Sequence, residues 1–166
     1  MVLDAVQITL GNAGITMATD QTNQATSAKE RERWLYEAEV RAERPYQQLR
    51  LSTHGLLLQI DARRAFLAGA WASVIVIAQA VVEASMRDLQ TNDYVTRSKD
   101  LFFGQEDLER IRTLRNELLH PSPPGVPSHV WMVPNGDFAA CHAALEPDAK
   151  KAYELMLDAV FGCGNA

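Results

Sequence analysis

Three polar side chains in the segment "LRNELLHP" could act together on a phosphodiester: Arg115, Asn116 and His120. A histidine has a pKa of about 6.5, so it can take up or release a proton near neutral pH. An arginine presents paired N–H donors in one plane, and these suit the charge that develops on a phosphate in the transition state. These residue types could therefore supply proton transfer beside a fixed cation.

Arg115 stands where an amphipathic helix should bury an apolar side chain. On a helical wheel it falls inside an arc of five apolar residues: Leu108, Ile111, Leu114, Leu118 and Leu119. A covered guanidinium is costly unless it pairs with a carboxylate or meets an anion. The sequence leaves both alternatives open, an ion pair with Glu83 or a site for a phosphate.

His120 should mark the end of that helix, because Pro121 disfavours α geometry in the residue before it. In an ideal helix, five residues of separation rotate two side chains apart by about 140° and lift them by about 7.5 Å. His120 and Arg115 therefore need a departure from the helix, or a second chain, to meet. Arg112 and Asn116 lie on the flank nearer His120 and could supply further donors. Alternatively, His120 caps the last carbonyls of its helix.

Other helices must position this segment, which is predicted to be helical from about 105 to 119. Ser27 and Glu30 have the spacing of a capping box, and we expect a helix from there to the region of Pro45, which kinks or ends it. A second helical piece runs toward Asp61, which either caps the next helix or lies within a longer one. A closing helix is predicted in "PDAKKAYELMLDAVF".

The stretch from Ala62 to Gln90 is the longest helical candidate. Between Ala65 and Val82 only Ser73 and Gln79 are clearly polar, so a transmembrane helix must be weighed. That run is rich in Ala and Gly and shorter than the ~20 apolar residues that a bilayer requires. We therefore expect a central helix buried on nearly all sides, and no membrane partner. Glu83 lies on its polar side and needs a partner if it is covered.

Composition limits the classes of function. A chain of 166 residues that is 47% hydrophobic suits one domain, and a net charge of −5 argues against a broad basic surface for nucleic acid. Cys141 and Cys163 form no CxxC pair, so we expect no disulfide framework, no metal site and no cofactor, in a reducing cytoplasmic setting. The first residues lack a basic segment before an apolar run, and a signal peptide is not expected.

The segment 1–26 is rich in Thr, Asn, Gln and Gly, and we expect it to be an arm outside the core, either a short strand or without regular structure. Residues 27–166 are predicted to form a single all-α domain. The proline-rich segment that begins at Pro121 reads as an irregular loop. Three aromatic rings near its end, of His129, Trp131 and Phe138, would either stack on a base or, by the more common pattern, anchor the loop to the core. Other aromatic residues are predicted to pack in the core: Trp34, Tyr36 and Trp71.

The segment "RNELLH" resembles the motif of HEPN domains, which are all-α proteins with an Arg, a polar residue directly after it, and a His four to six residues beyond the Arg. Arg115, Asn116 and His120 match this motif, with four residues between Arg and His. The preceding "AGAWASVIVIAQAVVEASMRDL" is similar to the long family helix, which often carries an acidic residue, and Glu83 is the matching candidate. The resemblance covers roughly residues 62–162.

The resemblance implies a helical bundle with a long central helix, and a metal-independent endoribonuclease whose two copies form one composite cleft as a homodimer. It also implies a toxin or phage-defence role, with an antitoxin or another protein as partner and RNA as substrate. Arg115 would stabilise the phosphate, His120 would transfer a proton, Asn116 would orient the motif or contact the phosphate, and Glu83 and Arg112 would support them. The alternative is a non-catalytic helical dimer that binds a protein or a nucleotide.

Overall fold

The structure is a computed structural model, which describes residues 26–43, 52–90, 106–120 and 137–161. Within these ranges every regular element is an α-helix and no strand is present, which confirms the predicted all-α class. The arm predicted for residues 1–26 lies outside the described residues, except for Thr26. The helices are α1 (Ala28–Ala42), α2 (Thr53–Ala68), α3 (Trp71–Gln90), α5 (Glu106–Leu119), α6 (Phe138–Ala144) and α7 (Glu146–Phe161).

The capping box predicted at the start of α1 is present. The Ser27 hydroxyl accepts a hydrogen bond from the Glu30 backbone N–H at 3.3 Å, and the Glu30 carboxylate accepts one from the Ser27 N–H at 2.8 Å. These two bonds satisfy donors that a helix start otherwise leaves open. The helix ends at Ala42, before Pro45, as the sequence predicts.

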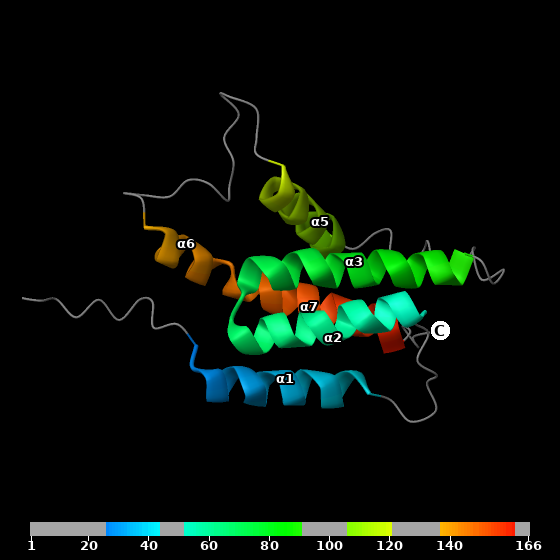
Figure 1. The fold of residues 1–166 in the computed structure, drawn as a ribbon, viewed down its shortest axis with the longest axis horizontal. Helices are drawn as coiled ribbons and strands as arrows, with labels where there is room; N and C mark the ends of the chain where they lie inside the picture. The colour runs from blue at the N-terminus through cyan, green and yellow to red at the C-terminus, as the bar shows by residue number, and fades with distance from the viewer. Residues whose placement is uncertain (1–25, 44–51, 91–105, 121–136, 162–166) are drawn as a thin grey trace, which may run out of the picture.

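The single helix predicted from Ala62 to Gln90 is wrong, because the chain turns at Gly69. This residue ends α2 with φ 71° and ψ 24°, a left-handed conformation that glycine adopts at little cost. Its N–H donates to the carbonyls of Ala65 and Phe66. Figure 1 shows the result, two helices that lie side by side and are joined by this turn. Asp61 lies inside α2, which agrees with the longer-helix alternative.

The central helix of the bundle is α3, which contacts α2 and α7 most extensively and also packs against α5 and α6. In Figure 1 this green helix runs between α5 and α2. Its apolar side chains face those of α7 in the core, which includes Val74, Ile75, Ala78, Val81, Ala152, Met156 and Val160. No helix in the described ranges is both long and apolar enough to cross a bilayer.

An aromatic cluster joins α1, α2, α3 and α7. Phe66 is fully buried and stacks on Trp34, with 4.7 Å between ring centroids, and it meets the edge of Trp71 at 5.3 Å. The packing role predicted for Trp34 and Trp71 is therefore confirmed. Tyr36 is 67% exposed and Phe138, at the start of α6, is 71% exposed, so the packing interpretation is wrong for both. His129 and Trp131 lie outside the described residues.

The Tyr153 hydroxyl joins three of these helices, α1, α2 and α7, through polar contacts. Tyr153 on α7 donates a hydrogen bond from its Oη to the Glu39 carboxylate on α1 at 3.0 Å. The same carboxylate oxygen accepts a hydrogen bond from Nε of Arg63, which lies on α2, at 3.1 Å. Burial, together with the negative charge of Glu39, raises the pKa of Tyr153 well above its usual value.

Candidate functional site

The covered face of α5 agrees with the predicted wheel in most positions. Leu108 and Ile111 are buried, and Leu114 and Leu118 pack against the core from its edge. Leu119 is 49% exposed, so its predicted place in the covered arc is wrong. The helix ends at Leu119, which confirms that it stops at His120.

Two ion pairs also fasten α5 to α7. Arg110 Nη2 lies 2.7 Å from Asp148 Oδ1, and Lys151 Nζ lies 2.9 Å from Asp107 Oδ2. The hydrogen bond to Asp107 raises the pKa of Lys151. The orientation of α5 is therefore set by its apolar contacts and by these charges on its outer side.

Arg115 lies at the edge of this interface and pairs with Glu83 on α3. Its Nη2 donates to Glu83 Oε1, and its side chain is 21% exposed. The sequence offered this ion pair as one of two alternatives, and the pair is present. Because the Glu83 side chain is itself 40% exposed, the pair is not sealed from solvent.

The guanidinium is only partly engaged by this contact. A bidentate pair would use two nitrogens, whereas the described residues provide one hydrogen bond, from Nη2. Arg115 Nε is buried and has no hydrogen-bond partner among the described residues. The Arg115 guanidinium is thus held through Nη2 alone. It could bind a further acceptor without first losing a two-nitrogen contact with Glu83.

The remaining motif residues form an exposed polar row along α5. Arg112, Asn116 and His120 follow one another at intervals of four residues, so they lie near one another on one side of the helix, and all three are exposed. The His120 backbone N–H donates to the Asn116 carbonyl at 2.8 Å, which extends the helical pattern to the histidine. Among the described residues, Arg112 Nη1 lies 3.8 Å from Glu109 Oε1, a weak ion pair between exposed side chains.

The described chain therefore brings Arg115 and Glu83 together but joins His120 to neither of them. Among the described residues no hydrogen bond or ion pair links the His120 side chain to Arg115. This agrees with the rotation expected from five residues of helix. A cleft that contains both Arg115 and His120 would need a second wall opposite the exposed row of Arg112, Asn116 and His120.

One residue of this site was not assigned to it from the sequence. Gln79 lies one turn before Glu83 on α3, is 3% exposed, and donates from Nε2 to Glu83 Oε1 at 3.5 Å. Its place in an otherwise apolar run was a visible signal. Its contact with Glu83 at the α5 interface became apparent only in the folded chain.

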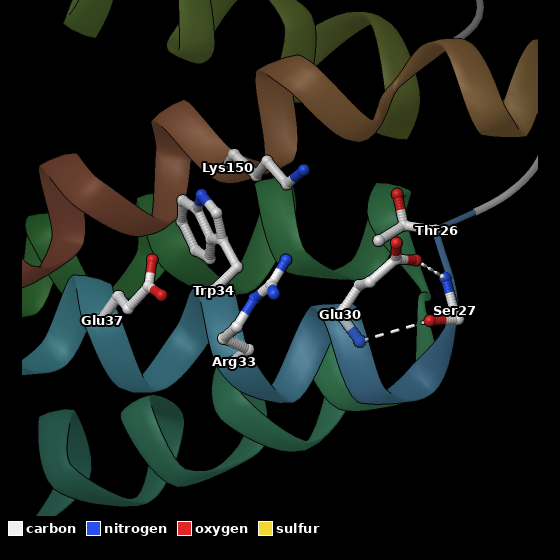
Figure 2. A pocket seen from close by; sticks show the side chains of 7 residues that line it. All are labelled: Thr26, Ser27, Glu30, Arg33, Trp34, Glu37 and Lys150. Atoms are coloured by element: carbon white, nitrogen blue, oxygen red, sulfur yellow. Dashed lines mark hydrogen bonds between the residues drawn. The ribbon is translucent and has the colours of Figure 1, made fainter.

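A separate groove of about 680 Å³ opens between the start of α1 and α7 (Figure 2). It is lined by Thr26, Ser27, Glu30, Arg33, Trp34, Glu37 and Lys150. Lys150 Nζ lies 2.6 Å from Glu146 and 5.8 Å from the centroid of the Trp34 ring. Glu30 is occupied by the capping box. The charged side chains Glu30 and Lys150 in the groove are therefore already paired within the protein. None of the residues that line the groove belongs to α5, which carries the motif.

The described ranges contain no group of three His, Cys, Asp or Glu side chains that could hold a metal ion. Cys141 is a free thiol of intermediate exposure, and Cys163 lies outside those ranges. Comparison of the chain with protein-family models, with curated proteins and with solved structures gave no match. The resemblance to HEPN domains therefore rests on the motif residues and on the order of the helices around them.

Proposed function

We propose that this chain is a metal-independent RNA endonuclease of the HEPN type. The observation that supports the proposal best is the contact of Arg115 with Glu83. Arg115 donates to Glu83 from one nitrogen, Nη2, and part of its side chain stays exposed. A cation fixed in this way can receive a phosphodiester at small cost in side-chain entropy. Because the net charge of the chain is −5, binding of RNA would depend on such local cations and would weaken with salt.

The proposal includes a homodimer in which the α5 helices of two copies face each other. A single chain presents Arg112, Asn116 and His120 on an open surface, and a second copy would supply the opposite wall of a cleft. The exposed Leu119, next to this row, offers apolar area that a second copy could cover. The proposed natural role, as a cytoplasmic toxin or phage-defence component with an antitoxin, rests on the resemblance alone.

The proposed reaction uses two imidazoles and no metal ion. His120 of one copy takes the proton of a 2′-hydroxyl, and the oxygen attacks the adjacent phosphorus to give a 2′,3′-cyclic phosphate. The 5′-oxygen leaves with a proton donated by the other copy's His120, which is in its imidazolium form, so that one imidazole gains a proton and the other loses one. Arg115 stabilises the negative charge on the non-bridging oxygens, and Asn116 contacts the phosphate or orients the motif.

The test is cleavage of single-stranded RNA in EDTA by the full chain and three variants. We expect His120→Ala to lose about 10²- to 10⁴-fold in rate, the usual range for a proton-transfer group. We expect Arg115→Ala to lose about 10²- to 10³-fold, the usual range for a donor that stabilises charge in the transition state. Arg64→Ala is the matched control, because Arg64 is an exposed arginine on α2 that pairs with Asp61. Equal rates in all four proteins would exclude this site. A solution mass equal to one chain at every concentration would exclude the composite cleft.

The Arg115–Glu83 pair also favours a second candidate, a non-catalytic helical dimer that binds a protein or a nucleotide. In that case the resident carboxylate satisfies the cation, and the pair serves the packing of α3 on α5. This candidate predicts a dimer that leaves RNA intact in EDTA. It also predicts that Arg115→Ala and Glu83→Ala weaken the dimer or the fold to a similar extent.

A further inference from the structure

Gln79 is a buried amide whose presence the packing of α3 does not explain. It is 3% exposed, and buried apolar residues of the same helix surround it in sequence: Ile75, Ala78, Val81 and Val82. Its Oε1 is buried and has no hydrogen-bond partner among the described residues. An unpaired carbonyl oxygen in a core is unfavourable, and Leu or Met would fill a similar volume without it. The amide must serve something that an apolar side chain cannot.

The Gln79 amide nitrogen meets Oε1 of Glu83 at 3.5 Å, and Arg115 Nη2 donates to that same oxygen. The three side chains therefore form a line from the core of α3 to the partly exposed edge of α5. The position of the Glu83 carboxylate decides where the guanidinium can rest. The carboxylate itself has a donor on the buried side only because residue 79 is an amide.

Ser85 on the same helix shows what a buried polar group with a local role looks like. Its side chain is fully buried, and its hydroxyl donates to the Val81 carbonyl of its own helix at 2.9 Å. That bond ends within α3 and reaches no other element. Gln79 differs because its contact continues through Glu83 to Arg115 on another helix.

We propose that Gln79 is a positioning residue that holds Glu83, and through it Arg115, in the orientation that receives a phosphodiester. A phosphate oxygen that drew Nη2 away from Glu83 would leave this carboxylate partly buried, and Gln79 would remain as its donor. Gln79 thereby limits the cost of releasing the guanidinium and returns it to one position afterwards. The orientation of Arg115 is a property of the fold, whereas its use on a phosphodiester rests on the proposed function.

The first experiment follows the Nε–Hε signal of Arg115 by NMR in the full chain, with the signal assigned from Arg115→Lys. We expect Gln79→Leu to shift or broaden this signal, and we expect Ser85→Ala to leave it unchanged. In a Glu83→Gln background, Gln79→Leu should have much less effect, because the influence of Gln79 passes through the carboxylate. An unchanged signal in Gln79→Leu, or an equal change with and without Glu83, would overturn the proposal. If Gln79→Leu does not fold, Gln79→Met takes its place.

The second experiment measures RNA cleavage and thermal unfolding of the same variants. We expect Gln79→Leu to lower kcat by about 10²-fold, the scale of a small misplacement of a reacting group, with KM changed less. Its melting temperature should equal or exceed that of the wild type, since an unpaired buried oxygen is removed. A wild-type kcat in Gln79→Leu would overturn the functional role. If the wild type itself cleaves no RNA, the proposed nuclease fails, while the NMR result still decides whether Gln79 positions Arg115.

Discussion

The Glu83–Arg115 pair allows a prediction that separates its contribution to stability from its contribution to function. Glu83→Leu would leave a guanidinium that is only 21% exposed without a counter-charge. Hydrogen bonds to charged groups contribute about 1.5–3 kcal/mol, and partial exposure of both partners places this pair toward the lower end. We therefore expect Glu83→Leu to reduce the free energy of unfolding by about 2 kcal/mol, or Tm by about 4–8 °C in a domain of this size.

The double variant Glu83→Leu/Arg115→Leu should recover most of this loss. Arg115 lies in an arc with Leu108, Ile111 and Leu118, so a leucine there joins an apolar surface and leaves no buried charge. Replacing a covered ion pair by apolar side chains is often neutral or stabilising. We expect the double variant to lie within about 1 kcal/mol of the wild type, and to be inactive if the nuclease proposal holds.

The assay is urea unfolding, followed by circular dichroism, of the wild type, Glu83→Leu, the double variant and a control variant, Asp61→Ala, with comparison restricted to proteins whose m-values agree. The exposed Asp61–Arg64 pair is the control, and Asp61→Ala should change the free energy of unfolding by less than about 1 kcal/mol. A double variant less stable than Glu83→Leu alone would refute the reasoning. It would mean that the pair is retained for the fold, and would favour the non-catalytic candidate.

Four further predictions concern the fold that presents the site. Tyr153→Phe should cost about 1 kcal/mol in urea unfolding, because it removes the partly buried hydrogen bond to Glu39. The free energy of unfolding of the wild type should fall above about pH 10, because Tyr153 ionises there in the unfolded chain but stays neutral in the folded chain, where its pKa is raised. In urea unfolding at a series of pH values, Tyr153→Phe should lack the part of this decrease that comes from Tyr153. Gly69→Ala should lower stability in thermal melts by about 1–2 kcal/mol, since it forces a left-handed φ on alanine and places Cβ 3.3 Å from Arg31 Cζ. Phe66→Ala should cost about 3–5 kcal/mol, measured by urea unfolding.

Elements with local signals were predictable from the sequence. The capping box of Ser27 and Glu30 and the apolar periodicity of α5 and α7 depend on residues a few positions apart, and each helix forms where it was expected. The turn at Gly69 was missed because the apolar pattern continues through it. Its stabilisation is distant, since Arg31 on α1 donates from Nε to the Leu67 carbonyl at 2.9 Å across the end of α2. Such a contact cannot be read from local spacing.

The site, like the fold, was predictable where the signal lies in the sequence pattern of one helix, and not where it depends on how two helices pack. A cation inside an apolar arc requires a partner, and the sequence named Glu83, the residue that Arg115 contacts. Gln79 was visible as a polar residue in an apolar run, but its link to Arg115 requires the packing of α5 on α3. The separation of His120 from Arg115 was predictable from helix geometry, and among the described residues no hydrogen bond or ion pair joins their side chains.

The attachment of α5 gives a physical reason why function and stability can be separated here. The helix is fixed to α3 by apolar side chains and to α7 by the pairs Arg110–Asp148 and Lys151–Asp107, none of which involves Arg115. Loss of Glu83 should therefore free the guanidinium without displacing the helix that bears it. A substitution at residue 83 or 79 then changes where one cation points while the exposed row of Arg112, Asn116 and His120 stays in place. Under the proposed function, Glu83 and the buried amide of Gln79 behind it would orient that cation, whereas in the non-catalytic candidate the pair would serve the packing of α3 on α5.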